Sequence, residues 1–170
     1  MDVADLLADL FGRVDDEIEG AIGGLSAEQL ATAPEPGANT IGWLVWHLTR
    51  VEDSHIAELI DGAGQLWESG SWAAGFELAP DPSNSGYGHT ADDVMAVRPA
   101  STAALRDYYR AVRERTSAYL ATLTPADLDR VVDRRWDPPV TLGVRLISIA
   151  DDEIQHAGQA AYARGLLDRR

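Results

Sequence analysis

The sequence contains no cysteine, and this absence limits the chemistry that the chain can do by itself. A disulfide framework and a thiolate zinc site are both excluded, because each needs cysteine sulfur. A bound metal ion would have to be held by His, Asp, Glu or water. Any nucleophilic sulfur in a reaction would have to come from a second molecule.

Lysine is absent as well, so all 14 basic residues are arginine, set against 28 acidic residues. The formal net charge of −14 should repel a phosphate backbone, which disfavours nucleic-acid binding. The exclusive use of arginine resembles the codon bias of a high-GC genome such as that of an actinobacterium. That indication concerns origin and carries no functional meaning.

Long hydrophobic runs are missing too. No uninterrupted apolar run approaches about 18 residues, the length that a membrane-spanning helix needs. The N-terminal stretch MDVADLLADLFGRVDDEIEG is amphipathic and acidic, without the cationic region that begins a secretory signal. We therefore expect a cytoplasmic protein with no membrane partner.

What is present predicts one domain over residues 1–170. With 45% hydrophobic residues, the chain can bury one full core but is short for two. Apolar residues recur at three- and four-residue steps in four segments, which predicts helices over roughly 3–22, 40–60, 102–123 and 141–167. We expect an all-α four-helix bundle with a long crossover connection between helices two and three.

The crossover, residues 62–99, is rich in Gly, Ser, Pro and aromatic residues. A connection of this length is unusual in a compact domain unless it has a function or short helices of its own. We expect it to act as a lid, with an apolar pocket wall formed by Trp67, Trp72, Phe76 and Tyr87.

Three side chains on the second and fourth helices are candidates for a metal site. His47 lies at the edge of the apolar stripe of helix two, in the stretch IGWLVWHLTR. Asp152 and His156 lie four residues apart on helix four, so both side chains can converge on one point. Two or three such ligands and an open position are what a catalytic zinc site requires.

Each candidate also has an ordinary structural explanation. A lone histidine such as His47 or His55 is more often a buried or boundary residue than a ligand. Asp152 and His156 could be a helical ion pair worth a few tenths of a kcal/mol. For His89 we favour a turn residue over a general base.

Helix four also carries two other acids beside the candidate ligand. Asp151, Asp152 and Glu153 point about 100° apart, and the i, i+4 register with His156 selects Asp152. Glu153, three residues before His156, remains the alternative. The main apolar stripe of this helix is expected to consist of Leu146, Ile147, Ala150, Ile154, Ala157 and Ala161, with Ile149 on the face of the candidate ligands.

The motifs WHLTR at residues 46–50 and DxxxHxGQ at residues 152–159 carry a family resemblance. With a third helix and a long crossover between them, they resemble the DinB-like metal-binding four-helix family, particularly its mycothiol-dependent members. The resemblance covers essentially the whole chain. It implies that His47, Asp152 and His156 bind a divalent ion, commonly zinc and sometimes nickel. Where Asp152 stands, similar maleylpyruvate isomerases have glutamate and many other relatives have histidine.

The resemblance further implies a function. A divalent ion held by these side chains could bind mycothiol or another small thiol as its thiolate, for attack on an electrophilic small molecule. Catalytic residues beyond the ligands stay unassigned. The same site could instead activate water in a hydrolase, or serve a non-catalytic metal-binding stress protein. The family comparison also suggests a homodimer.

Overall fold

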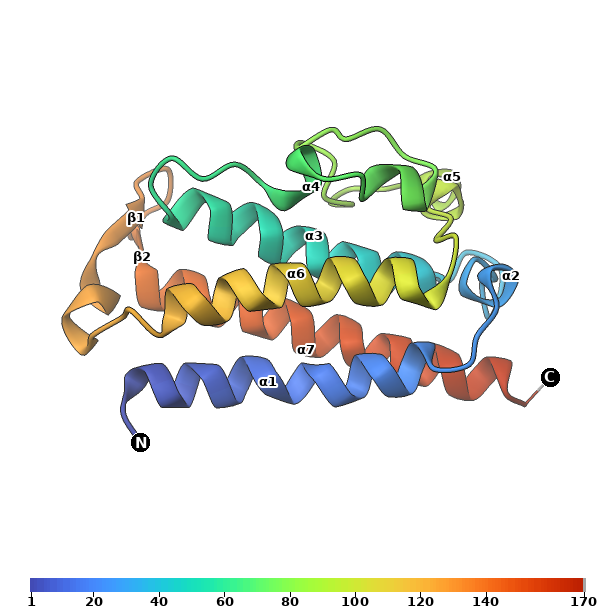
Figure 1. The fold of residues 1–170 in the computed structure, drawn as a ribbon, viewed down its shortest axis with the longest axis horizontal. Coiled ribbons are helices and arrows are strands. Elements are labelled where there is room, and N and C mark those ends of the chain that lie inside the picture. Colours follow the sequence, from blue (N-terminus) through green and yellow to red (C-terminus); the bar gives the residue numbers. More distant parts are fainter. Residues whose placement is uncertain (170) are drawn as a thin grey trace.

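The computed structural model describes residues 1–169, and within them four long helices pack side by side as a bundle (Figure 1). They are α1 (Val3–Ile22), α3 (Ile41–Leu59), α6 (Thr102–Leu120) and α7 (Leu142–Leu167). The predicted all-α bundle is confirmed. Among the described residues, no helix combines the length and apolar composition that a membrane crossing requires.

Short polar side chains fix where these helices begin. The hydroxyl of Thr40 accepts a 3.0 Å hydrogen bond from the backbone N–H of Trp43, and Ser101 and Thr141 cap α6 and α7 in the same way. Each cap satisfies a donor that the first helical turn leaves unpaired. The predicted helix starts are therefore confirmed, while α6 ends at Leu120, about one turn earlier than expected.

Short elements fill the connections between the long helices. The crossover contains α4 (Leu66–Ser69), the 3₁₀ helix η1 (Ala73–Phe76) and α5 (Ala91–Ala96), and it covers α3 in Figure 1. The first connection contains α2 (Ala27–Leu30). The third contains η2 (Pro125–Asp129) and a two-stranded antiparallel sheet, β1 (Val131–Asp133) with β2 (Val140–Thr141).

The aromatic residues of the crossover are mainly core residues, which corrects the expected pocket wall. Trp67 and Phe76 are fully buried, and their rings lie 5.3 Å and 6.1 Å from the ring of Tyr108 on α6. Trp72 is half-buried and packs on the same tyrosine. Tyr87 alone of the four expected residues is exposed, at 93%. Apolar side chains in a connection can complete a core as readily as they line a pocket, because both remove apolar surface from water.

The apolar stripe expected on α7 is wrong at several positions. Ile147 and Ile154 are exposed, whereas Ile149 and the charged Glu153 are fully buried. The reason is that α7 packs against both α3 and α1, so it buries two faces rather than one. A helix between two neighbours has no single stripe for the sequence pattern to reveal.

Two buried charged residues on α3 fasten the crossover to the bundle. The Arg50 guanidinium donates to the backbone carbonyls of Pro82 and Asn84, both at 3.1 Å. One turn later, the Asp53 carboxylate accepts from the backbone N–H groups of Leu66 and Trp67, both at 2.9 Å. Because Arg50 and Asp53 are fully buried, these bonds form in a medium that strengthens them.

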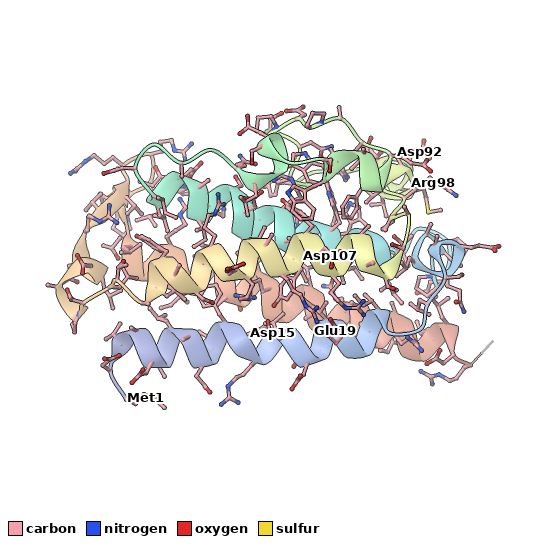
Figure 2. All side chains as sticks on the ribbon, viewed as in Figure 1. Met1, Asp15, Glu19, Asp92, Arg98 and Asp107 are labelled. Carbon is pink, nitrogen blue, oxygen red and sulfur yellow. The ribbon has the colours of Figure 1, made fainter. Side chains whose placement is uncertain are left out.

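Ion pairs join α1 to α6. Asp15 and Glu19 lie on the side of α1 that faces α6 (Figure 2). Glu19 accepts two hydrogen bonds from Arg106, at 2.6 Å and 2.8 Å, and Asp15 accepts one from the hydroxyl of Tyr109. Deeper in the bundle, Arg113 reaches the buried carboxylates of Glu52 and Glu153.

Candidate metal centre

Helices α3 and α7 bring His47, Asp152 and His156 together. One possible ligand atom from each side chain lies within 4.8 Å of those of the other two. His47 is buried, and the other two are half-buried. The three side chains predicted from the sequence as metal ligands therefore form one cluster, on helices that pack directly against each other.

Hydrogen bonds to one nitrogen of each imidazole orient both rings. Nδ1 of His47 lies 2.6 Å from the backbone carbonyl of Ser85, and Nδ1 of His156 lies 3.0 Å from the amide oxygen of Gln159. Both partners are acceptors, so each Nδ1 donates a proton, and in the neutral form of each ring Nε2 keeps its lone pair. Metal-binding histidines are commonly oriented in this way.

Asp152 supplies the test of whether a cation fits here. Its Oδ1 lies 3.6 Å from Nε2 of His156, and its buried Oδ2 has no hydrogen-bond partner among residues 1–169. A buried carboxylate oxygen without a partner is costly, and a cation beside it would remove that cost. Two imidazole nitrogens and one carboxylate form a usual ligand set for zinc and related divalent ions. The residues present therefore fit such an ion.

The protonation of the two histidines differs because their surroundings differ. Burial lowers the pKa of His47, which favours the neutral imidazole that a metal requires. The neighbouring carboxylate of Asp152 raises the pKa of His156. Each imidazole must be unprotonated at Nε2 to bind a metal, so binding at His156 would release a proton in the range where this ring is charged.

Aromatic side chains pack around the candidate ligands, and the sequence analysis did not predict these contacts. The indole of Trp43 stacks on His47 with 4.6 Å between ring centroids and 13° between planes. The same indole N–H donates to Nδ1 of His89 at 3.1 Å, and Nε2 of His89 faces the side-chain oxygen of Asn84 at 2.9 Å. His89, on the crossover, is thus held between Trp43 of α3 and Asn84 of the crossover.

The neighbouring acids on α7 point elsewhere. Asp151 is exposed and accepts a hydrogen bond from Gln155. Glu153 is fully buried and accepts from Arg113 at 2.8 Å, and burial together with Glu52 raises its pKa. Of the three adjacent acids, Asp152 is the one that lies with His47 and His156.

A cavity of about 290 Å³ opens beside the cluster. Its lining includes the candidate ligands His47 and Asp152 together with residues of α3 and the crossover: Val51, Ser54, His55, Ser85 and Tyr87. The crossover therefore contributes to the site through Ser85 and Tyr87 rather than through its tryptophans. His55, expected to be structural, lines the cavity.

Comparison with known proteins shows which family the chain belongs to. A solved structure of a conserved protein from Enterococcus faecalis is 33% identical to this chain, with a TM-score of 0.90, and the match covers 100% of this chain and 99% of that one. No curated protein matches the sequence. The sequence pattern described as mycothiol-S-transferase matches residues 6–169. The chain therefore belongs to the mycothiol-S-transferase family of DinB-like proteins.

Proposed function

We propose that the protein is a metal-dependent S-transferase that joins the sulfur of mycothiol, or of a related small thiol, to an electrophilic small molecule. The observation that carries the proposal is the convergence of His47, Asp152 and His156 beside a cavity that His47 and Asp152 line. Membership of the mycothiol-S-transferase family supports it. The absence of cysteine agrees with a sulfur supplied by a cosubstrate.

The three side chains would hold a divalent ion, most simply zinc, with nickel as the alternative. When bound, such an ion lowers the pKa of a thiol and holds it as the nucleophilic thiolate. His47 and His156 would bind through Nε2, with their rings oriented by Ser85 and Gln159, and Asp152 would contribute one negative charge. Fixed ligands keep the site in one geometry, which limits the reorganisation needed during the reaction.

The cavity beside the ligands would receive both substrates. Val51 and the crossover residue Tyr87 form part of its wall, and Ser54 and His55 add polar groups. Confining a thiol and an electrophile together turns a bimolecular collision into a reaction between oriented neighbours. In the transfer, a carbon–sulfur bond forms in every case. In an addition the thiol proton ends on the electrophile, whereas in a substitution a leaving group departs and the thiol proton passes to solvent.

Conjugate formation tests this function directly. The protein, stripped of metal and then reloaded with zinc, is incubated with mycothiol and a panel of electrophiles, and conjugates are measured by mass spectrometry. We expect a zinc-dependent rate above that of the thiol and electrophile alone. Hydrolysis of a panel member without thiol incorporation would favour the hydrolase alternative. Zinc binding without either product would favour a non-catalytic metal-binding protein.

A further inference from the structure

A second cavity, of about 540 Å³, continues outward from the metal centre. It shares His55 and Tyr87 with the inner cavity. Its other lining residues come from the third connection and the start of α7: Asp133, Arg135, Trp136 and Arg145. The strands, the end of α3 and the start of α7 meet at one end of the bundle (Figure 1). The two cavities thus adjoin at His55 and Tyr87, and the candidate ligands His47 and Asp152 line the inner one.

The charge of the outer cavity differs from that of the whole chain. Two arginines and one aspartate line it, although the chain as a whole carries −14. Glu58 stands near His55, but its side chain is more than half exposed and its charge is solvated. An arginine-rich lining in an acidic protein favours an anion at this place.

Arg145 is held in position while much of its hydrogen-bonding capacity is unused. Its side chain is only 14% exposed, and Nη2 donates to the Asp133 carboxylate at 3.1 Å. Nη1 lies 3.4 Å from Nδ1 of His55. A guanidinium has five N–H groups, and these contacts engage two of them among residues 1–169.

Asp133 explains the fixed position of Arg145. Its carboxylate is 5% exposed and accepts two hydrogen bonds from the Arg135 side chain, at 2.9 Å and 2.8 Å, in addition to the one from Arg145. A carboxylate shared between two arginines leaves an excess positive charge. A guanidinium already fixed in place loses less entropy when it binds a ligand.

The aromatic walls are uncovered. Trp136 is 66% exposed and Tyr87 is 93% exposed, and both line the same cavity. Exposed rings of this size next to a fixed cation provide apolar contact area beside a point of charge recognition.

We propose that the outer cavity binds the carboxylate of an anionic substrate through Arg145, with the apolar body of that substrate packed against Trp136 and Tyr87 and its reactive end directed to the metal centre. The inference rests on the proposed function, because it names the substrate class of that same site. The carboxylate belongs either to the electrophile or to the thiol, and the two sources can be distinguished.

Binding of two probes of equal shape tests the subsite without requiring turnover. The affinities of 4-methylbenzoate and 4-methylbenzamide for the zinc-loaded protein are measured by calorimetry. We expect the benzoate to bind at least about tenfold more tightly, as charge-assisted hydrogen bonds require. In Arg145→Gln the two affinities should agree within about twofold, and Arg145→Lys should restore part of the preference. Arg110→Gln, an exposed change on α6, should keep the full preference.

Two outcomes overturn the subsite. Equal affinities for benzoate and benzamide in the wild-type protein would show that no anion is recognised. A preference that persists unchanged in Arg145→Gln would show that the carboxylate binds elsewhere, for example at the metal. Trp136→Ala gives an independent check that does not disturb the Asp133 ion pairs. This substitution should weaken the binding of both probes to a similar extent, while the preference for benzoate over benzamide remains. Unchanged affinity for both probes would remove the aromatic wall from the proposal.

Turnover then identifies which substrate carries the carboxylate. In one arm, 4-(bromomethyl)benzoate and 4-(bromomethyl)benzamide react with mycothiol; a carbon–sulfur bond forms, bromide leaves and the thiol proton passes to buffer. In the other, N-acetylcysteine and its amide react with 4-(bromomethyl)benzamide. A preference of about tenfold or more in kcat/KM for the acid in one arm assigns the carboxylate to that substrate. If conjugates form but neither arm shows a preference for the acid, the subsite is overturned and the proposed function is not. If no metal-dependent conjugates form, the proposed function is contradicted, and the calorimetry still decides the subsite.

Discussion

Nδ1 of His47 lies 2.6 Å from the backbone carbonyl oxygen of Ser85. This contact joins a candidate ligand on α3 to the crossover, 38 residues further along the chain. Arg50 holds the same part of the crossover through the carbonyls of Pro82 and Asn84. The orientation of a side chain on a rigid helix therefore depends on a loop that the bundle core fastens in place.

Substitution of the glycine that follows Ser85 should disturb the metal centre. A Cβ at Gly86 would lie 2.6 Å from Nδ1 of His47 and 3.0 Å from the Trp46 ring, at a residue whose φ is +93°. In Gly86→Ala the loop must move, and the hydrogen bond that orients His47 lengthens. We expect zinc affinity, measured by competition with a chelator, to fall by about tenfold or more, as for other residues that orient ligands.

Gly88 offers a matched control on the same loop. Its φ is +76°, but a Cβ there would meet no atom of the described chain within 4 Å. Gly88→Ala should lose about 1 kcal/mol of stability from the left-handed backbone alone and keep its zinc affinity. Equal loss of zinc affinity in both variants would mean that loop strain, rather than the contact with His47, controls the site.

The buried ion cluster of Arg113, Glu52 and Glu153 should make a large contribution to the stability of the bundle. Arg113 lies 3.2 Å from Glu52 and 2.8 Å from Glu153, and both glutamates are fully buried. Arg113→Met leaves two carboxyl groups without their cation, so we expect a loss of about 3–5 kcal/mol in the free energy of unfolding by urea. Adding Glu52→Gln and Glu153→Gln to the Arg113→Met variant should restore much of the lost free energy of unfolding. A loss no larger than that of Arg110→Met, at an exposed site, would contradict this role.

The ion pair between Glu19 of α1 and Arg106 of α6 should make a pH-dependent contribution to the free energy of unfolding. The hydrogen bond from Arg106 lowers the pKa of Glu19 below its ordinary value of 4.5. A carboxyl group with a lowered folded pKa stabilises the protein above the unfolded pKa, and this contribution disappears as pH falls through the folded pKa. Because Glu19 is partly exposed, Glu19→Gln should cost only about 0.5–1 kcal/mol at pH 7. Unfolding curves should show the difference in stability between the wild-type protein and Glu19→Gln shrinking and then vanishing as the pH falls below 4.5. A difference in stability that grows on acidification would be evidence against this pair.

The bundle and its candidate ligands could be predicted because they depend on local patterns. Helix periodicity, the caps at Thr40, Ser101 and Thr141, and the four-residue spacing of Asp152 and His156 are all legible in sequence. The residue that orients His156 could also have been found, since Gln159 falls one turn later on the same helix.

The remaining features depend on contacts between distant segments. The bond between Ser85 and His47 joins the crossover to α3 through a backbone carbonyl, which any residue type carries, so the sequence does not reveal it. The burial of Trp67 and Phe76 follows from the path of the crossover over Tyr108, and the burial of Glu153 from the packing of α7 between two helices. The dimer, the cytoplasmic location and the actinobacterial origin stay predictions.

The most direct test of the metal centre is the zinc affinity of Asp152→Asn beside that of Asp151→Asn. Asn keeps the size of the side chain and removes its charge, and Asp151 is an exposed neighbour outside the cluster. For wild-type protein purified without a metal-affinity tag, we expect about one divalent ion per chain. Affinity should fall well over tenfold in Asp152→Asn and stay unchanged in Asp151→Asn. Zinc binding that survives Asp152→Asn, or that is lost instead in Glu153→Gln, would contradict the account.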